Sequence, residues 1–173
     1  GIDLVALATV ADAVPLVGDN RRLVARGLRA MRERPRPAIA ALCDAAGIEP
    51  RTLTARSLGF TLAPCVNAAG RLAHAGRALE LMLAPDREAA DPIARELWEL
   101  NRERQDVERA ITEEAIAQVE AEPEHIREAD AVVAAGDRWH EGVVGIVASR
   151  LVERFARPAI VIARDGDRAK GSG

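Results

Sequence analysis

Asp12 is the first residue whose surroundings suggest chemistry, because it lies near the end of a mostly apolar run from Ile2 to Val14. A carboxylate in such surroundings usually caps a turn, pairs with a cation or binds a metal. A cap before Pro15 and a metal ligand both remain open on these residues alone. Since hard cations take several oxygen ligands, Asp12 by itself cannot define a metal site.

A second candidate is the stretch Asn67-Ala-Ala-Gly70-Arg71. Its small residues would let the backbone approach a ligand, while Asn67 offers an amide and Arg71 a guanidinium that fits phosphate. A tight turn between helices with a solvated arginine explains the same residues. The stretch from Ala63 to Leu72 contains Pro64, Asn67 and Gly70, so we expect it to be too irregular for one element.

Two further segments lie near the C-terminal end. His140-Glu-Gly142-Val-Val-Gly145 follows an expected strand and opens an expected helix, and free amides at a helix N-terminus bind anions. His140 could then contact a phosphate oxygen or act near the chemistry, although a histidine beside Trp139 is often only a packing residue. Lys170-Gly171-Ser172 offers a cation, a hydroxyl and flexible backbone, or an artificial linker.

The elements that must position these residues are mostly helices. The run from Ile2 to Val14 is a buried helix or strand, with its length favouring helix. Asn20 is a predicted cap for a helix to about Glu33 whose inner side holds Leu23, Leu28 and Met31. Three short helices are predicted at residues 38–46, 54–60 (capped by Thr54) and 76–84.

The clearest element runs from about Asp91, a predicted N-cap before Pro92, to Glu120. One apolar stripe follows the three- and four-residue spacing of a helix. Its members are Ile93, Leu97, Leu100, Val107, Ile111, Ala115 and Val119. The Arg and Glu residues on the other faces are expected to be solvated. Such a helix would be about 45 Å long, so it is predicted to connect two lobes.

After Pro123 the pattern changes to strands at 129–135 and 158–163, separated by a helix at 143–155. This order predicts a βαβ unit, and Asp165-Gly166 predicts a tight turn into a third strand. The sequence is thus expected to be α/β overall and mainly helical. His74 and His125 are isolated and are expected to lie on the surface.

Composition limits the class of protein. Among 173 residues, 49% are hydrophobic and 29% charged, with a net charge of −3, which suits a soluble globular chain and argues against a uniformly basic surface. No run of about 18 apolar residues and no secretory signal occur. Cys43 and Cys65 lack CxxC spacing, which disfavours a disulfide scaffold or a zinc site and fits a reducing cytoplasm. The chain starts with Gly1 and ends just after an expected strand, so it is interpreted as a piece of a longer protein.

Taken in order, these segments resemble the RecJ family of DHH phosphoesterases, which are single-strand-specific DNA exonucleases. The resemblance spans the chain. It rests on the ordered blocks at residues 3–16, 20–24, 62–72 (Leu-Ala-Pro-Cys-Val-Asn-Ala-Ala-Gly-Arg-Leu), 100–105 (Leu-Asn-Arg-Glu-Arg-Gln), 139–151 (Trp-His-Glu-Gly-Val-Val-Gly-Ile-Val-Ala-Ser-Arg-Leu), 157–160 and 170–173.

The resemblance implies three regions. Residues 1–85 would be the C-terminal part of a DHH domain with a helical region, 86–122 the long connecting helix, and 123–173 the first half of an α/β DHHA1 domain. It also implies two Mn²⁺ or Mg²⁺ ions, held mostly by ligands outside this chain, that polarise a phosphate and activate water for 5′→3′ release of nucleotides. Single-stranded DNA is the implied substrate, and a single-strand-binding protein and a repair helicase are further candidate partners; no membrane is implied.

By the same resemblance, Asp12 matches a metal-binding aspartate and becomes a candidate catalytic residue together with His140. Arg71, beside Asn67, matches a residue implicated in holding the DNA 5′ end. Lys170, Gly171 and Ser172 match the start of the Gly-Ser-Gly-Arg-Ser phosphate-binding motif. His140 and Gly142 are predicted separately to bind nucleic acid or phosphate, from their place at a helix N-terminus. Cys65 departs from the family, which often has arginine there, and this change either weakens backbone contacts or is tolerated.

Two alternatives remain. One is a DHH/DHHA1 nanoRNase or cyclic-dinucleotide phosphodiesterase, although those relatives generally lack the long helix and the Asn-Ala-Ala-Gly-Arg block. The other is a non-catalytic single-strand-binding module, because one aspartate cannot hold a metal pair. The chain by itself is expected to be inactive and to bind single strands weakly and with strong salt dependence.

Overall fold

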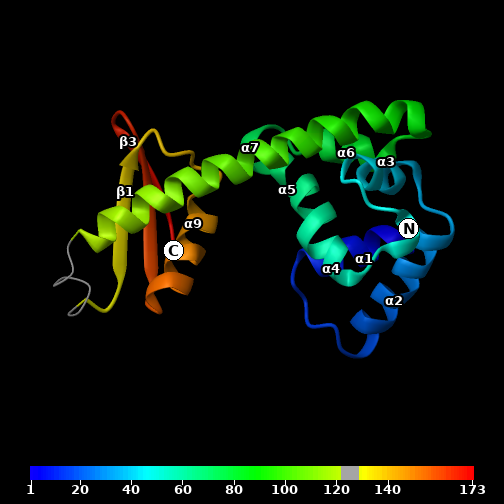
Figure 1. The fold of residues 1–173 in the computed structure, drawn as a ribbon, viewed down its shortest axis with the longest axis horizontal. Helices are drawn as coiled ribbons and strands as arrows, with labels where there is room; N and C mark the ends of the chain where they lie inside the picture. Colours follow the sequence, from blue (N-terminus) through cyan, green and yellow to red (C-terminus); the bar gives the residue numbers. More distant parts are fainter. Residues whose placement is uncertain (122–128) are drawn as a thin grey trace. The chain divides into compact units, whose positions relative to one another are not determined.

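The computed structural model describes residues 1–121 and 129–173, and it divides into two compact units, Gly1–Arg102 and Glu103–Gly173. The first unit is helical and the second is a small α/β unit, as Figure 1 shows. The predicted mainly helical α/β fold is therefore confirmed. The predicted boundary at residues 122 and 123 and the surface position predicted for His125 lie outside the described residues. Within the described part, no helix is both long enough and apolar enough to cross a membrane.

The first unit is built from short helices that pack side by side. They are α1 (Ile2–Ala11), α2 (Gly18–Glu33), α3 (Pro37–Ala45), η1 (Pro50–Thr52), α4 (Ala55–Ser57), η2 (Leu58–Leu62), α5 (Ala63–Leu72), α6 (Gly76–Leu83) and the start of α7 (Arg87–Glu120). The apolar run that periodicity left open is helical, and it ends at Ala11 rather than near Pro15. The short helices predicted near residues 38–46 and 76–84 are confirmed.

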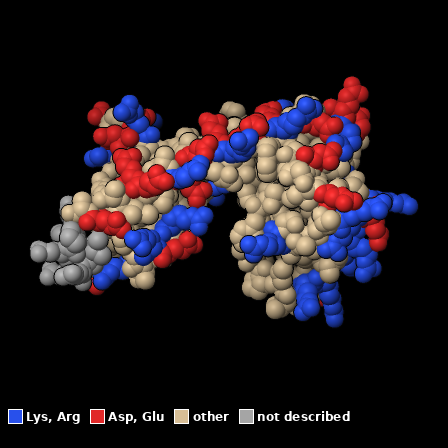
Figure 2. Space-filling model, in the orientation of Figure 1, with Lys and Arg blue, Asp and Glu red and all other residues tan. Residues whose placement is uncertain are grey.

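The first two helices cross closely because Gly27 faces Ile2 and Ala6. A Cβ at Gly27 would overlap the Ala6 side chain and lie 2.7 Å from the Ile2 carbonyl oxygen. The Asp3 carboxylate at the start of α1 accepts two hydrogen bonds from the guanidinium of Arg36, one of them 3.0 Å long. Figure 2 shows basic side chains, all of them arginines, over α2, whose outer face is exposed. Helix α2 therefore packs on one side and is basic on the other.

Two predicted helix caps were wrong. Helix α2 begins at Gly18, so Asn20 lies within its first turn, and its side-chain Nδ2 donates to the Pro15 carbonyl (3.2 Å). Helix α7 begins at Arg87, so Asp91 and Pro92 lie inside it. The Asp86 carboxylate accepts from the amide of Ala89 (2.9 Å) and caps that helix instead. Helix α7 starts earlier because Asp86 satisfies one of its first amides, whereas Val17 at the N-cap of α2 gives no side-chain cap.

The stretch predicted to be irregular is helical. Thr54 caps α4 as predicted, with reciprocal bonds between Thr54 and Ser57. The helix then continues through one π-turn, η2, into α5, and the amide of Ala63 donates to the carbonyl of Leu58. Pro64 lies in the first turn of α5, directly after the widened π-turn. Proline has no amide hydrogen to donate, and the first turn of a helix tolerates this lack. Pro64 therefore failed as a turn signal because it occupies the first turn of α5, a position where a helix tolerates proline.

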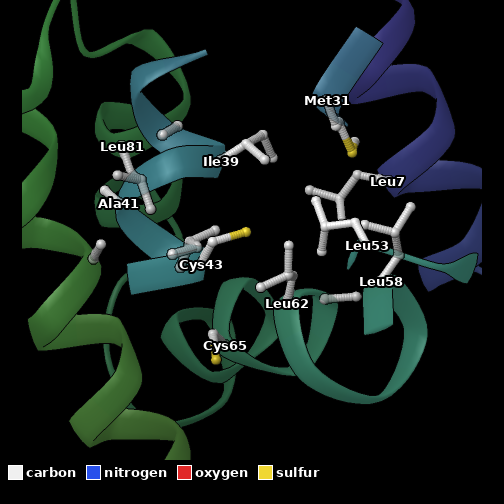
Figure 3. Packing of buried hydrophobic residues seen from close by; sticks show 14 of the residues in the cluster. Leu7, Met31, Ile39, Ala41, Cys43, Leu53, Leu58, Leu62, Cys65 and Leu81 are labelled. Carbon is white, nitrogen blue, oxygen red and sulfur yellow. The ribbon is translucent and has the colours of Figure 1, made fainter. Parts of the chain in front are cut away.

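The core of the first unit is a single hydrophobic cluster. Figure 3 shows side chains from α1, α2, α3 and the η2–α5 helix pointing toward one another. Leu58, Leu62, Cys65, Ile39 and Met31 are completely buried. Full burial of each large side chain stabilises the fold by about 1.5–3 kcal/mol. This core fixes the faces that α1 and α5 present to solvent.

The second unit contains a three-stranded sheet in the order β1 (Val132–Asp137), β2 (Ala159–Asp165), β3 (Arg168–Ser172). Strands β1 and β2 are parallel and joined by α9 (Val144–Phe155), so the predicted βαβ unit is confirmed. Strand β3 returns antiparallel through the predicted turn, where Gly166 has φ +56°. Alternate residues of β1 and β2 are buried, namely Val132, Ala134, Ala159, Val161 and Ala163.

Helix α7 contributes its C-terminal half to the second unit. Its buried stripe includes Leu97, Ile111, Ala115 and Val119 as predicted, but its middle consists of Asn101, Arg104 and Glu108. The expectation that every charged side chain of this helix is solvated was therefore wrong. Arg104 donates to Glu108 (2.6 Å), and Arg150 of α9 donates to the other Glu108 oxygen (3.2 Å). These partners make burial of the charges tolerable.

Candidate functional site

The predicted site residues fall into two groups, one in each unit. Asp12, Asn67 and Arg71 belong to the first unit. His140, Gly142, Lys170, Gly171 and Ser172 belong to the second unit. We describe each group within its own unit.

Asp12 lies at the C-terminal end of α1 and is exposed. Its amide donates to the Ala8 carbonyl (3.0 Å), and the next residue, Ala13, has φ +52°, so the chain turns away sharply before Pro15. The side chain forms no hydrogen bond or ion pair with the described residues, so Asp12 does not cap a turn there. A carboxylate at a helix C-terminus faces the negative end of the helix dipole, which favours a nearby cation.

Asn67 and Arg71 lie four residues apart on α5, and both are exposed. That spacing places them on the same face of the helix, one turn apart. Gly70, beside them, leaves the local backbone open, since the nearest atom to a Cβ there would be Ala75 Cβ at 3.9 Å. The structure therefore presents an amide, a guanidinium and an uncrowded backbone on a regular helix rather than on a turn.

His140 lies in the loop that joins β1 to α9 and is exposed, whereas its neighbour Trp139 is buried. The Gly142 amide donates to His140 Nδ1 (3.0 Å), and the Val143 amide donates to the His140 carbonyl (3.1 Å). His140 is therefore not a packing residue. Because Nδ1 accepts a hydrogen bond, Nε2 carries the proton of the neutral ring and can donate outward.

The start of α9 and the strand β3 come together. A Cβ at Gly145 would lie 3.1 Å from Ser172 Oγ, so glycine allows the Ser172 hydroxyl to approach the first turn of α9. Lys170 Nζ lies 3.2 Å from Glu141 Oε2, in an ion pair whose side chains are both 63% exposed. The two segments predicted separately to bind phosphate are thus adjacent in the structure.

This arrangement suits an anion. Val143 at the N-cap position of α9 gives no side-chain cap, and the positive end of the helix dipole lies there. The Ser172 hydroxyl and the Lys170 ammonium add a donor and a charge. Because exposed ion pairs are worth little, an incoming phosphate can replace Glu141 as the partner of Lys170 at small cost.

Charge is distributed unevenly between the units. Residues 1–102 contain 14 arginines against 12 acidic residues, whereas residues 103–173 contain 10 basic against 15 acidic residues. The first unit is therefore slightly basic and the second acidic, so an anion site in the second unit would depend on local geometry around Lys170 rather than on the net charge of the unit.

Sequence reasoning missed the contacts that hold the His140 loop. Trp139 Nε1 donates to Glu114 of α7 (2.9 Å), and the Trp139 ring lies against Gly136, where any Cβ would overlap it. Residues at helical spacing form the buried face of α7, at positions 97, 101, 104, 108, 111 and 115. This spacing could have been found in the sequence, but three of the six residues are polar, so an apolar pattern does not show it. These contacts place His140 at the C-terminal end of β1.

Both cysteines are free and fully buried. Cys65 Sγ donates to the Thr61 carbonyl (3.1 Å) within the η2–α5 helix, so it is a core residue. Burial raises the pKa of Cys43 to about 11, which keeps its thiol protonated.

Among the described residues, no cluster of three or more His, Cys, Asp or Glu side chains could hold a metal ion.

Comparison with known proteins gives consistent matches. No family model matches the chain. The single-stranded-DNA-specific exonuclease RecJ of Bacillus subtilis is 40% identical over 173 residues, covering 99% of this chain and 22% of the relative. RecJ of Escherichia coli is 42% identical over 176 residues, covering 99% of this chain and 30% of the relative.

The chain matches a segment of RecJ. A crystal structure of exonuclease RecJ bound to manganese superimposes with a TM-score of 0.81 at 38% identity, covering 94% of this chain and 40% of that chain. RecJ from Thermus thermophilus in complex with Mg²⁺ gives a TM-score of 0.79 at 35% identity, covering 94% and 25%. The chain therefore spans less than a third of the curated RecJ relatives cited above.

Proposed function

We propose that this chain is part of a RecJ-type exonuclease that removes nucleotides from single-stranded DNA in the 5′→3′ direction. The observation that carries the proposal is the adjacency of Gly145 and Ser172, which brings two segments of the resemblance together at the start of α9. The relatives named above are single-stranded-DNA-specific exonucleases, which favours this function over a nanoRNase or a purely binding module. The chain alone is proposed to be inactive.

In this proposal, residues 1–85 belong to a DHH domain, 86–122 to a connecting helix and 123–173 to a DHHA1 domain. The protein would act in DNA repair and recombination in the cytoplasm, with a single-strand-binding protein and a repair helicase as partners. The two free, buried cysteines support a reducing compartment.

The proposed cofactors are Mn²⁺ or Mg²⁺, the ions named for the RecJ structures. Asp12 fits one ligand position, because its carboxylate is exposed and has no partner among the described residues. The other ligands would come from parts of RecJ that this chain does not cover. When bound, such ions activate water and stabilise charge on the scissile phosphate.

The residues of this chain would position the strand. Arg71 and Asn67 would hold the 5′ end through bidentate and amide hydrogen bonds. Lys170, Ser172 and the first amides of α9, with the Gly142 segment, would bind a backbone phosphate. His140, held by the Gly142 amide at Nδ1, would donate from Nε2 to a phosphate oxygen.

The test is degradation of 5′-labelled single-stranded and duplex DNA, with Mn²⁺, by the full-length protein that contains this chain, beside the chain alone. We expect rapid loss of single strands only, and only with the full-length protein. Asp12→Ala should abolish this activity without lowering the melting temperature, whereas the exposed Asp19→Ala should leave it unchanged. Cleavage restricted to very short oligonucleotides or cyclic dinucleotides would replace the RecJ proposal with the nanoRNase one.

A further inference from the structure

The aromatic ring of Phe60 is exposed to solvent. It is 74% exposed, although the helix around it buries Leu58 and Leu62 completely. The other large apolar residues that are highly exposed in the described part of the chain are aliphatic, such as Val17 and Leu83, each 69% exposed. Because exposing a phenyl ring gains nothing for the fold, its position points to a contact with a group that lies outside this chain.

Arg56 gives the ring a specific chemistry. Its guanidinium carbon lies 5.0 Å from the centroid of the Phe60 ring, in a cation–π contact. No carboxylate pairs with Arg56 among the described residues, so its charge is not neutralised there. A flat ring beside an uncompensated guanidinium is the combination that binds a nucleobase and its phosphate in single-stranded nucleic acids.

The ring is also held in a defined place. Phe60 lies in the π-turn η2 (Leu58–Leu62), and π-turns within helices often mark functional positions. The neighbouring Gly59 packs against α1, where a Cβ would lie 3.1 Å from Val10 Cγ1, two residues before Asp12. Further along the same continuous helix, α5 exposes Asn67 and Arg71. One helix thus carries an aromatic ring, two guanidiniums and an amide.

We propose that Phe60 is a stacking platform for one base of single-stranded DNA, and that Arg56 orients the ring and contacts the adjacent phosphate. This inference rests on the proposed function and adds a base contact to phosphate contacts. Stacking is tolerant of sequence because every base has a flat face, which suits an enzyme that acts on any single strand.

The test uses this chain and a short oligodeoxythymidylate with one 2-aminopurine at low ionic strength, where stacking of the probe on an aromatic ring quenches its fluorescence. Phe60→Leu keeps an apolar side chain but removes the flat ring. We expect roughly 5- to 100-fold weaker binding and loss of quenching. Phe60→Tyr and Phe60→Trp should restore both. Leu83→Ala, which alters an equally exposed apolar residue, should change neither.

The outcomes separate the two proposals. If wild type binds the strand and Arg71→Ala weakens binding while Phe60→Leu does not, stacking is refuted and the nuclease assignment stands. If Phe60→Leu binds and quenches like wild type but Phe60→Ala does not bind, the contact is merely apolar and the platform is again refuted. Absence of binding by the wild-type chain under these conditions would overturn the stacking platform, whereas the nuclease assignment is tested by DNA degradation with the full-length protein.

Discussion

The side-chain amide of Gln118 pairs with the backbone of Ala135 in the way that a neighbouring strand would. Its Nε2 donates to the Ala135 carbonyl (3.2 Å), and the Ala135 amide donates to its Oε1 (2.9 Å). Strand β1 is an edge of the sheet, so these two bonds satisfy backbone groups that would otherwise face solvent. A helix residue therefore closes part of the sheet edge.

Replacing Gln118 with alanine should expose that edge. We expect faster hydrogen exchange of the Ala135 amide and a loss of about 1 kcal/mol in the free energy of unfolding, because water replaces the lost bonds only in part. Gln105→Ala alters an exposed glutamine of the same helix and should leave both unchanged. Unaltered exchange at Ala135 in Gln118→Ala would contradict the role of this side chain.

Gly136 should tolerate no side chain. A Cβ there would overlap the Trp139 ring, which is 6% exposed and bonded to Glu114. Gly136→Ala is expected to displace Trp139 and to lower the unfolding free energy by about 1–3 kcal/mol, as overpacked cores do. Urea unfolding followed by tryptophan fluorescence measures this. Gly76→Ala, where nothing lies within 4 Å of a Cβ, should be neutral or slightly stabilising.

Glu108 joins two arginines, and its removal should be costly. Glu108→Ala deprives the buried Arg104 and the half-exposed Arg150 of the carboxylate that both contact, so we expect a loss of about 3 kcal/mol. Glu153→Ala removes only an exposed partner of Arg150 and should cost less than about 0.5 kcal/mol. The pair Arg104→Met with Glu108→Leu should recover most of the stability in chemical denaturation; a further loss would contradict this account.

Stability should fall in acid because of Asp3. Burial alone would raise the pKa of Asp3, but the hydrogen bond and charge of Arg36, with the Leu4 amide, lower it from 3.8 to about 2. Since the folded-state pKa is depressed, this stabilisation is present above pH 3.8 and is lost as the pH falls toward 2. Asp3→Asn should cost about 2 kcal/mol at neutral pH and flatten the acid limb of the stability curve. Asp19→Asn, at an exposed pair, should change neither.

Arg71 should matter most at a phosphorylated end. In the full-length protein, we expect Arg71→Ala to weaken binding of 5′-phosphorylated single strands more than binding of strands without that phosphate, because a bidentate contact is lost. Lysine at this position should restore the charge but not the full preference. Arg26→Ala, in the exposed basic face of α2, serves as the control. Equal losses for both strands in fluorescence anisotropy would refute end recognition.

The sequence predicted the elements whose signals are local. The helix ending before Gly47 and the βαβ unit with its turn at Gly166 follow from spacing and turn residues, and the structure confirms them. The two segments at the corner of the second unit could be selected from the sequence, but not their adjacency. That adjacency depends on β3 returning beside β2 in a defined register, with Ser172 opposite Val161.

The sequence did not reveal ion pairs between residues that lie far apart along the chain. Arg104 and Glu108 read as solvated because their stabilising partner, Arg150, lies 42 positions from Glu108. Pro64 reads as a turn residue because the π-turn that precedes it leaves no mark in the pattern of apolar residues. Phe60 escaped notice for a related reason, since an apolar residue amid apolar neighbours is assumed to be buried.

The π-turn at Leu58–Leu62 amounts to one residue inserted into a helix. Deleting a single residue there would restore regular winding and rotate Phe60 relative to Asn67 and Arg71 by about 100°, the turn per residue of an α-helix. The length of this segment, and not only its composition, is therefore under constraint: substitutions can be absorbed one at a time, whereas a single deletion would turn the exposed aromatic and the guanidinium toward different sides.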